Sequence, residues 1–193
     1  FVDALALRHK NGLQVTTVAS STTTARRAQA AGLPLQALEH TAAIDLYVDG
    51  ADEIAPDLTL LKGRGADLVR EKLLARAATA FVVDRVGARG PIPVEVLPFA
   101  WQLVQRTLKT LGVDSALREN ASKDGLFMSS AGNLVLEARF LDVAAEDRRF
   151  PDARAVDDVL NGVPGVVEHG VFVGLASRAL VVGADGVVDD RRR

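Results

Sequence analysis

Four ionisable side chains in one stretch of the chain have the types and spacing that proton-transfer chemistry needs. Asp49 and Asp52 lie three residues apart on a glycine-containing turn. Lys62 stands in a glycine-rich turn ten residues beyond Asp52, and Glu71 follows nine residues later. A carboxylate held away from water gains a pKa in the range useful for a general base. Residues 44–71 are therefore the stretch around which we expect the chain to be organised.

Glu71 is the most informative of the four because its helical neighbours are apolar. The residues on its face of a predicted helix are Leu68, Leu74, Ala75 and Ala78. No lysine or arginine stands three or four residues away, and Asp67 is a like charge. A carboxylate in an apolar stripe is costly unless it reaches solvent, has a distant partner or is functional. Two interpretations stay open: a glutamate at the edge of the stripe that reaches solvent, and a general base.

The other candidates each have an ordinary structural explanation as well. Aspartates on turns commonly hydrogen-bond their own backbone, which would account for Asp49 and Asp52. Lys62 could be a loop lysine beside a tight turn, and Glu53 is expected to be a solvated charge. A functional site is favoured because Asp49, Asp52, Lys62 and Glu71 all fall in one strand-loop-helix unit.

The predicted elements alternate in the way that builds a parallel sheet. We expect a first helix that stops at Gly12, strands at 13–19, 44–48 and 81–84, and a helix at about 66–79. Strands that alternate with helices indicate βαβ units. In such sheets ligands bind at the carboxyl ends of the strands, which is where the acidic turn falls.

A hydroxyl cluster at residues 20–24 precedes another predicted helix, which ends near Gly32 and Pro34. Such hydroxyl groups can cap a helix N-terminus. A helix N-terminus with spare hydroxyl groups also suits an anion such as phosphate. Ser20 and Ser21 are therefore candidates both for capping and for substrate binding.

Three prolines within residues 90–98 mark a change of composition that we interpret as a domain boundary. Beyond it the expected elements are a short strand, a helix at 99–111, strands at 116–119 and 133–140, a helix at 153–160 and a strand at 166–173. This β-α-β-β-α-β order is typical of a ferredoxin-like split βαβ. We expect an α/β fold with a Rossmann-like parallel-sheet domain at 1–92 plus about 174–193, including a returning strand at 179–182. Residues 93–173 would form a small ferredoxin-like α+β domain.

Composition excludes several functional classes. The 193 residues are 48% hydrophobic and 25% charged, with a formal net charge of −2, which describes an ordinary globular protein without a basic surface for nucleic acid. The arginines at 191–193 are expected to be a frayed end. Cysteine is absent, which excludes thiol chemistry, and three scattered histidines disfavour a metal cluster. No apolar run reaches the roughly 18 residues of a membrane span.

Five blocks of sequence occur in the same order as in a known enzyme family. They are YVDGADEI (47–54), LKGRGA with REKLLA (61–66 and 70–75), PVEVLP (93–98), GN (132–133) and PGVVEHGVF (164–172). The chain thereby resembles the type A ribose-5-phosphate isomerases, over most of its length.

The resemblance implies an aldose–ketose isomerase of the pentose phosphate pathway that needs no metal and no cofactor. It would interconvert D-ribose 5-phosphate and D-ribulose 5-phosphate through an enediolate. Glu71 would be the base that moves a proton between C1 and C2, while Asp49 and Asp52 would handle ring opening and hydroxyl protons. Lys62, with the amides of the following turn, would stabilise the oxyanion. The implied substrate-binding residues are Asp49, Gly50, Ala51, Asp52, Lys62, Gly63, Arg64 and Gly65, beside Ser20 and Ser21.

The chain departs from the family pattern within several blocks. Arg64 replaces a middle glycine of the lysine turn, which is costly if that position needs positive φ, although its guanidinium could instead contact phosphate. Residues 84–87 (DRVG) replace a motif with a substrate-binding lysine, for which Arg85 or Arg89 could substitute. Residues 129–133 (SSAGN) lack a carboxylate that the family has.

Two functions of different classes remain open. The first is an active isomerase whose phosphate loop precedes Phe1, since the sequence begins inside a helical pattern. The second is a catalytically weak or inactive sugar-phosphate-binding sensor on the same fold. The joint presence of the four candidate residues favours the enzyme, because a sensor has no need for the base. By resemblance we expect a homodimer or homotetramer. The absence of targeting signals and cysteines favours the cytoplasm.

Overall fold

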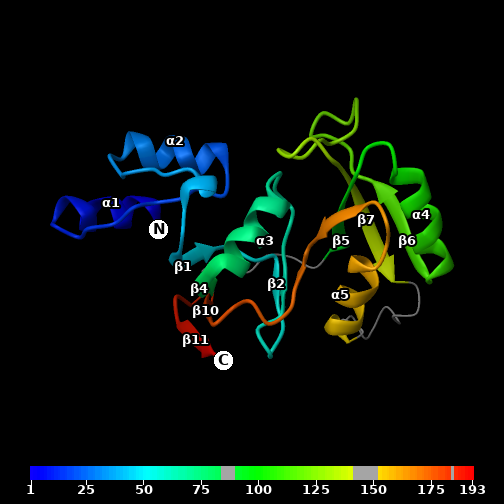
Figure 1. The fold of residues 1–193 in the computed structure, drawn as a ribbon. Coiled ribbons are helices and arrows are strands. Elements are labelled where there is room, and N and C mark those ends of the chain that lie inside the picture. The colour runs from blue at the N-terminus through cyan, green and yellow to red at the C-terminus, as the bar shows by residue number, and fades with distance from the viewer. Residues whose placement is uncertain (84–89, 141–151, 184) are drawn as a thin grey trace. The chain divides into compact units, whose positions relative to one another are not determined.

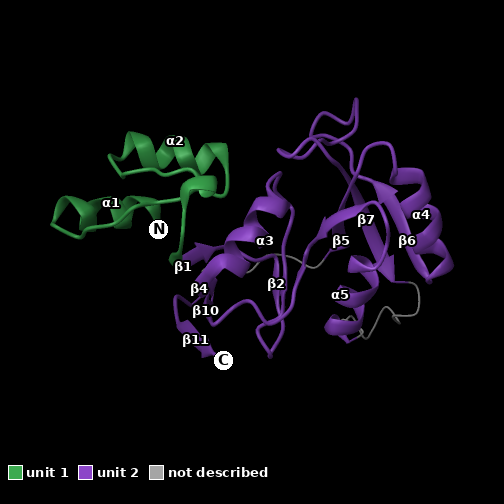
Figure 2. Cartoon of the chain, in the orientation of Figure 1, with its two compact units in different colours: residues 1–45 green, residues 46–193 purple. Residues whose placement is uncertain are grey.

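The computed structural model describes residues 1–83, 90–140, 152–183 and 185–193 (Figure 1). The chain forms two compact units, residues 1–45 and residues 46–193 (Figure 2). Among the helices in these described ranges, none is long and apolar enough to cross a membrane.

The first unit packs two helices over a small apolar core. Its elements are α1 (Val2–Lys10), α2 (Thr22–Ala30) and the 3₁₀ helix η1 (Leu38–His40). Ala6, Ala28 and Leu33 form its buried centre. Ser21 caps α2, because its hydroxyl oxygen accepts a hydrogen bond from the Thr24 backbone at 3.0 Å.

The strand expected at residues 13–19 was a wrong prediction. Among the described residues of this segment, Thr17 alone makes a β-bridge, with Leu35. Thr17 N donates to Pro34 O at 2.8 Å, and Gln36 N donates to Thr17 O at 2.9 Å. β-branched residues favour a strand, but a strand also needs a partner along its length, and the facing segment meets this one at a single residue.

The first sheet has four strands and carries one end of the candidate site. Its order is β1 (Ile44–Asp49), β4 (Ala78–Val83), β10 (Arg178–Val182) and β11 (Val188–Arg192). Strands β4 and β10 are parallel, whereas β10 and β11 form an antiparallel hairpin. Helix α3 (Leu68–Ala77) leads directly into β4. The predicted strands at 44–48 and 179–182 and the helix at 66–79 are therefore confirmed, with small shifts of their ends.

The arginines at 191–193 are not a frayed end. Arg191 and Arg192 belong to β11, which pairs with β10 along its whole length. Arg178 of β10 donates two hydrogen bonds to Asp190 of β11, at 2.7 and 2.9 Å. Asp189 and Asp190 precede the arginines and provide negative charges near them. These charges offset the repulsion between the arginines, so the segment can form a strand.

A second, smaller sheet places the lysine turn. Its order is β2 (Glu53–Ile54), β3 (Leu60–Leu61) and β9 (Val171–Phe172), all antiparallel. Lys62, directly after β3, donates its backbone N–H to Gly170 O at 2.8 Å. A Cβ at Gly170 would lie 2.2 Å from Lys62 O, so this close approach requires glycine. The strand predicted at 166–173 is accordingly divided at Gly170 into β8 and β9.

The third sheet is antiparallel and has the order β6-β7-β5-β8. Its elements along the chain are β5 (Ile92–Val96), α4 (Trp101–Thr110), β6 (Val113–Leu117), β7 (Leu134–Phe140), α5 (Ala153–Asn161) and β8 (Val166–His169). This is the predicted β-α-β-β-α-β order. The strand expected at 116–119 begins earlier, because Gly112 adopts φ +77° and lets the chain turn directly after α4.

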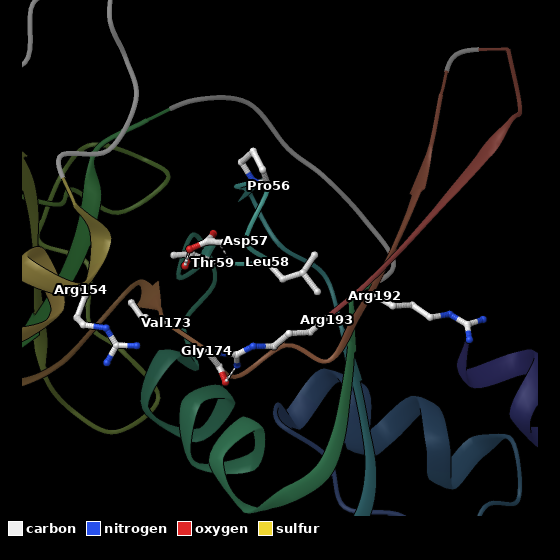
Figure 3. A pocket seen from close by; sticks show the side chains of 9 residues that line it. All are labelled: Pro56, Asp57, Leu58, Thr59, Arg154, Val173, Gly174, Arg192 and Arg193. Atoms are coloured by element: carbon white, nitrogen blue, oxygen red, sulfur yellow. Dashed lines mark hydrogen bonds between the residues drawn. The ribbon is translucent and has the colours of Figure 1, made fainter.

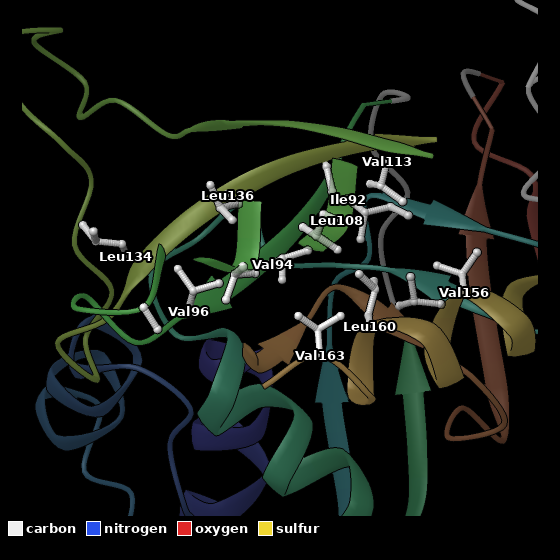
Figure 4. Close-up of a cluster of buried hydrophobic side chains, with 14 of the residues drawn as sticks. Ile92, Val94, Val96, Leu108, Val113, Leu134, Leu136, Val156, Leu160 and Val163 are labelled. Atoms are coloured by element: carbon white, nitrogen blue, oxygen red, sulfur yellow. The ribbon is translucent and has the colours of Figure 1, made fainter. Parts of the chain in front are cut away.

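The larger apolar core lies between this third sheet and its two helices (Figure 4). Fully buried side chains there include Val94, Val96, Val104, Leu108, Leu136 and Leu160. Residues 46–193 form one compact unit, and the domain boundary expected near residue 92 stays a prediction.

Candidate active site

The ammonium group of Lys62 lies at the centre of the candidate site. Its Nζ is 2.9 Å from Asp49 Oδ2, 3.1 Å from Glu71 Oε2 and 2.5 Å from the carbonyl oxygen of Gly50. Lys62 stands beside a tight turn, as the sequence also allowed, but it is only 3% exposed and its ammonium is held by site residues. Asp49 ends β1, Lys62 follows β3 and Glu71 lies in the first turn of α3. Three separate elements thus bring one cation and two carboxylates together.

Glu71 is largely buried and has a partner from outside its own helix. Its side chain is 15% exposed, so the interpretation as an edge residue reaching solvent is wrong. Burial raises the pKa of Glu71, Lys62 opposes that rise, and Asp49 adds to it. A carboxylate in this state is a stronger proton acceptor than one in water.

Asp49 is held by three donors at the carboxyl end of β1. Its carboxylate accepts hydrogen bonds from the Tyr47 hydroxyl, from Lys62 Nζ and from Gly50 N, the last at 2.8 Å. The turn chemistry that the sequence suggested is therefore present, together with the contact to the lysine. Ala51, the next residue of the turn, is buried.

Asp52 faces a different cation. Arg64 Nε lies 3.4 Å from Asp52 Oδ1, and the backbone N–H of Asp52 donates to Leu61 O at 2.8 Å. Burial raises the pKa of Asp52, while Arg64 and then Lys62 oppose the rise. The two aspartates of the turn thus have different surroundings: Asp49 contacts Lys62, whereas Asp52 faces Arg64.

The turn that carries Lys62 needs positive φ at Gly63 and not at Arg64. Gly63 has φ +102°, and a Cβ there would lie 3.0 Å from Leu68 Cδ1. Arg64 is not among the described residues with positive φ, so it replaces a family glycine without backbone strain. A Cβ on Gly65 would lie 4.0 Å from Glu71 Oε1, which places this glycine beside the Glu71 carboxylate.

Arg118 supports the same turn from the third sheet. Its Nη1 donates to Gly63 O at 2.9 Å, and its guanidinium forms an ion pair with Glu137. Three arginines, Arg64, Arg118 and Arg139, line a hollow of about 430 Å³ together with Glu137. This cationic hollow adjoins the lysine turn and can accept an anionic group.

A second hollow lies away from the candidate residues (Figure 3). It has a volume of about 360 Å³ and lies beside the turn from Pro56 to Thr59 and the side chains of Arg154 and Arg193. None of the predicted site residues lines it.

Several expected contributors are placed elsewhere or lie outside the described residues. Ser20 and Ser21 belong to the first unit, where Ser21 caps α2. Residues 84–87, with Arg85, and Arg89 lie outside the described residues. Glu53 was expected to be a solvated charge, but its carboxylate accepts a hydrogen bond from Gly90 N at 2.9 Å.

The SSAGN segment supports the start of α3. Ser130 N donates to Ala66 O at 2.9 Å. Ser129 Oγ and Asn133 Nδ2 both donate to the buried Glu95 carboxylate, at 2.5 and 2.9 Å. This segment therefore contacts the loop before the helix that carries the base, without placing a carboxylate of its own there.

Four residues around the site were not predicted from the sequence. Tyr47, Arg118 and Phe172 contact site residues, whereas Lys72 follows Glu71 in α3 and contacts Glu168 and His169. Tyr47, Lys72 and Phe172 lie inside the five sequence blocks, which was the available signal. Arg118 lies outside them, and its contact with Gly63 is made by the fold. Among the described residues, no group of three or more His, Asp or Glu side chains is arranged to hold a metal.

The fold and the site define a class of protein: an α/β enzyme with a proton-transfer site at the carboxyl end of a strand. A buried carboxylate of raised pKa, paired with an ammonium and next to further carboxylates, is the arrangement that this chemistry requires. Over residues 16–186 the chain matches the family of ribose 5-phosphate isomerase A (phosphoriboisomerase A). The chain belongs to this family.

Individual relatives agree with this assignment. The chain is 41% identical to ribose-5-phosphate isomerase A of Roseiflexus sp. (strain RS-1) over 184 residues, which is 91% of this chain and 76% of the relative. It is 39% identical to the Rhizobium meliloti (strain 1021) protein of the same name, covering 96% of this chain and 82% of that one.

Solved structures of similar fold carry the same name. A D-ribose-5-phosphate isomerase in complex with phospho-erythronic acid has a TM-score of 0.89 and 32% identity, covering 100% of this chain and 85% of that one. The ribose 5-phosphate isomerase A of Methanocaldococcus jannaschii has a TM-score of 0.86 and 29% identity, with the same coverage.

Proposed function

We propose that this chain catalyses the interconversion of D-ribose 5-phosphate and D-ribulose 5-phosphate. Its relatives at 41% and 39% identity are named for that reaction. The observation that carries the proposal is the contact between the Glu71 carboxylate and the Lys62 ammonium, 3.1 Å apart. A buried base beside a fixed cation can move a proton next to a carbonyl group and stabilise the charge that forms.

Glu71 acts as the base in this proposal. It takes the proton from C2 of open-chain ribose 5-phosphate, and the electron pair of that C–H bond moves into the enediolate. The protonated Glu71 then returns the proton to C1, which gives the ketose. Lys62, with the amides of the turn from Gly63 to Gly65, stabilises the negative charge on the substrate oxygen.

The aspartates move the oxygen-bound protons. Net isomerisation also transfers one proton from O2 to O1, and opening the sugar ring transfers another. The raised pKa of Asp52 supports a role in donating and accepting such protons. The hydrogen bond that Asp49 accepts from Lys62 Nζ supports a role for Asp49 in moving protons between the enediolate oxygens.

Substrate binding is assigned to the backbone around these groups and to Arg64. Gly50 and Ala51 border Asp49, and Gly65 adjoins Glu71. The cationic hollow beside Arg64 supports a contact with the substrate phosphate. The solved relative in complex with phospho-erythronic acid supports a site for a small phosphorylated sugar acid. A contribution of Ser20 and Ser21 to phosphate binding is proposed on the capping chemistry of α2 alone.

The finer architecture and assembly are part of the same proposal. The order β6-β7-β5-β8 with two helices supports a ferredoxin-like small domain at residues 93–173. The remaining strands support a Rossmann-like domain at 1–92 plus about 174–193. A cytoplasmic homodimer or homotetramer is proposed on family resemblance.

The alternative of a sugar-phosphate sensor is not favoured. A protein that only binds its ligand has no need for a buried carboxylate of raised pKa beside a buried lysine. The test is to incubate the full-length protein with ribose 5-phosphate and measure ribulose 5-phosphate. Formation of the ketose supports the isomerase. Its absence, together with a rise in melting temperature on adding ribose 5-phosphate, would replace the enzyme with a binding protein.

A further inference from the structure

Lys72, the residue after Glu71, carries a buried charge that the proposed mechanism does not use. It is 1% exposed. Its Nζ donates to Glu168 Oε1 at 2.5 Å and to His169 O at 2.7 Å, and it lies 4.9 Å from the centroid of the Phe172 ring. A buried ammonium is costly unless it is paired and hydrogen-bonded. These contacts tie helix α3 to strands β8 and β9.

The same segment also supports the catalytic lysine. Strand β3 pairs with β9, and Lys62 N donates to Gly170 O at 2.8 Å. Lys62 Nζ lies 5.6 Å from the centroid of the Phe172 ring, so one aromatic ring has both ammonium groups near it. Residues 168–172 are therefore a common support for the strand that leads to Lys62 and for the helix that carries Glu71.

The rotation of α3 decides whether Glu71 reaches Lys62. Adjacent residues of a helix project about 100° apart, so a fixed Lys72 sets the direction of Glu71. A side-chain atom roughly 6 Å from the helix axis moves about 1 Å for each 10° of rotation. Apolar contacts have little directional preference, whereas the bonds of Lys72 are directional. The 3.1 Å contact between Glu71 and Lys62 depends on that direction.

We propose that Lys72 is a positioning residue for the isomerase reaction: its bonds to Glu168 and His169 hold α3 in the rotation at which Glu71 meets Lys62. This inference rests on the proposed function. Lys72 is not itself a catalytic residue, because its ammonium is occupied by two acceptors in the protein interior.

The experiment compares wild type with Lys72→Met and with the double variant Lys72→Met/Glu168→Gln, all in the full-length protein. Methionine fills a similar space without a charge. In Lys72→Met alone, the Glu168 carboxylate would lose its cationic partner, and Glu168→Gln removes that unpaired charge. The glutamine side chain still offers an oxygen to His169 N, which donates to Glu168 Oε1 at 2.9 Å. The double variant therefore guards against loss of folding in the single variant.

Two kinetic changes are expected in both variants. The kcat falls by about 10²-fold, which is the size of effect that a displacement of about 1 Å produces. The KM for ribose 5-phosphate changes by less than about threefold, because the groups that bind substrate are intact.

The acid limb of the kcat/KM profile also moves to higher pH in both variants. The charged groups that face Glu71 are Lys62, Asp49 and Asp67, and separating Lys62 from it removes the cation that lowers its pKa.

A matched control separates positioning from charge. Arg76→Met removes a cation one turn further along α3 and leaves the bonds of Lys72 in place. It is expected to keep the wild-type kcat and acid limb. A folded double variant with wild-type kcat and an unshifted acid limb would overturn the inference, as would an equal effect in Arg76→Met. Absence of turnover in the wild type would instead contradict the proposed function.

Discussion

Single residues in this site owe their chemistry to a balance between burial and neighbouring charge. Burial raises the pKa of Glu71, and Lys62 at 3.1 Å opposes the rise without cancelling it. The same balance holds for Asp52, where burial outweighs Arg64 at 3.4 Å. In each pair the cation keeps the carboxylate in place, while burial keeps it able to accept a proton.

Removing the central cation should therefore affect chemistry more than binding. In Lys62→Met we expect kcat to fall by about 10²–10³-fold, because the developing oxyanion loses its fixed charge. The pKa of Glu71 should rise further, so the acid limb of kcat/KM should move to higher pH. Steady-state kinetics across pH measures both effects. A variant within twofold of wild-type kcat would show that Lys62 does not act on the transition state.

The raised pKa of Glu71 also predicts a conflict between stability and activity. Between its ordinary value of 4.5 and its raised value, the folded state binds more protons than the unfolded state. Stability contributed by this group is thus greatest below 4.5, falls as pH rises through that window and stays low above it. Glu71→Gln should have a higher melting temperature than wild type at alkaline pH, and the difference should vanish below pH 4.5. A lower melting temperature at alkaline pH would contradict this account.

At the scale of elements, the turn between β3 and α3 determines how Lys62 and Glu71 approach each other. Gly63 takes the positive φ, Lys62 precedes it inside the protein, and Arg64 follows with an exposed side chain. Arg118 fixes the turn from outside by its bond to Gly63 O. The turn therefore tolerates an arginine at its second position and requires glycine at its first.

Two alanine variants of this turn should separate stability from catalysis. Gly63→Ala places a Cβ 3.0 Å from Leu68 Cδ1 in a backbone with φ +102°, and we expect it to destabilise the fold by about 1–3 kcal/mol. Gly65→Ala meets its nearest neighbour, Glu71 Oε1, at 4.0 Å. It should leave the melting temperature unchanged and raise the KM. Thermal unfolding and kinetics of the two proteins test this, and equal destabilisation by both would contradict it.

Local patterns predicted the elements where a partner strand or helix was available in the fold. The strand ending at Asp49 and the helix carrying Glu71 were both found from residue types and spacing. Residues 13–19 have the β-branched residues of a strand but meet a partner only at Thr17, and residues 191–193 look frayed until Asp190 pairs with Arg178. Both errors concern pairing between segments, which local patterns do not record.

The site itself was predictable only in part for the same reason. Glu71, Asp49, Asp52 and Lys62 were singled out by type and spacing, and the structure brings Asp49, Lys62 and Glu71 into contact. Which carboxylate pairs with which cation could not be predicted. The role of Lys72 was also hidden, because its partners lie nearly a hundred residues further along the chain.

At the scale of the whole molecule, residues 168–172 connect the site to the third sheet, because β9 pairs with β3 and β8 pairs with β5. His169 lies at the centre of this connection, completely buried. Its Nδ1 accepts a hydrogen bond from Val171 N at 3.3 Å, and its Nε2 lies 3.2 Å from Asp157 Oδ1. Burial, with the nearby Lys72 and Arg76, lowers the pKa of His169 to about 3, so the imidazole is neutral in the folded protein.

Acid should destabilise the protein through this histidine. Between pH 6.5 and about 3 the unfolded state binds a proton that the folded state does not, so stability falls as pH decreases through that window. The full effect is at most roughly 5 kcal/mol. His169→Asn keeps an acceptor for Val171 N and removes the titration, so its melting temperature should depend less on pH in this range. Parallel slopes for the two proteins would show that His169 is not responsible.

The most direct test of the account is the rate of ribulose 5-phosphate formation by wild type and by Glu71→Gln, in the full-length protein with ribose 5-phosphate as substrate. Glutamine has nearly the shape of glutamate but cannot accept the C2 proton. We expect turnover by the wild type, a loss of at least about 10²-fold in kcat for Glu71→Gln, and a KM that changes little. Equal turnover by the two proteins would show that Glu71 is not the base and would contradict the central claim.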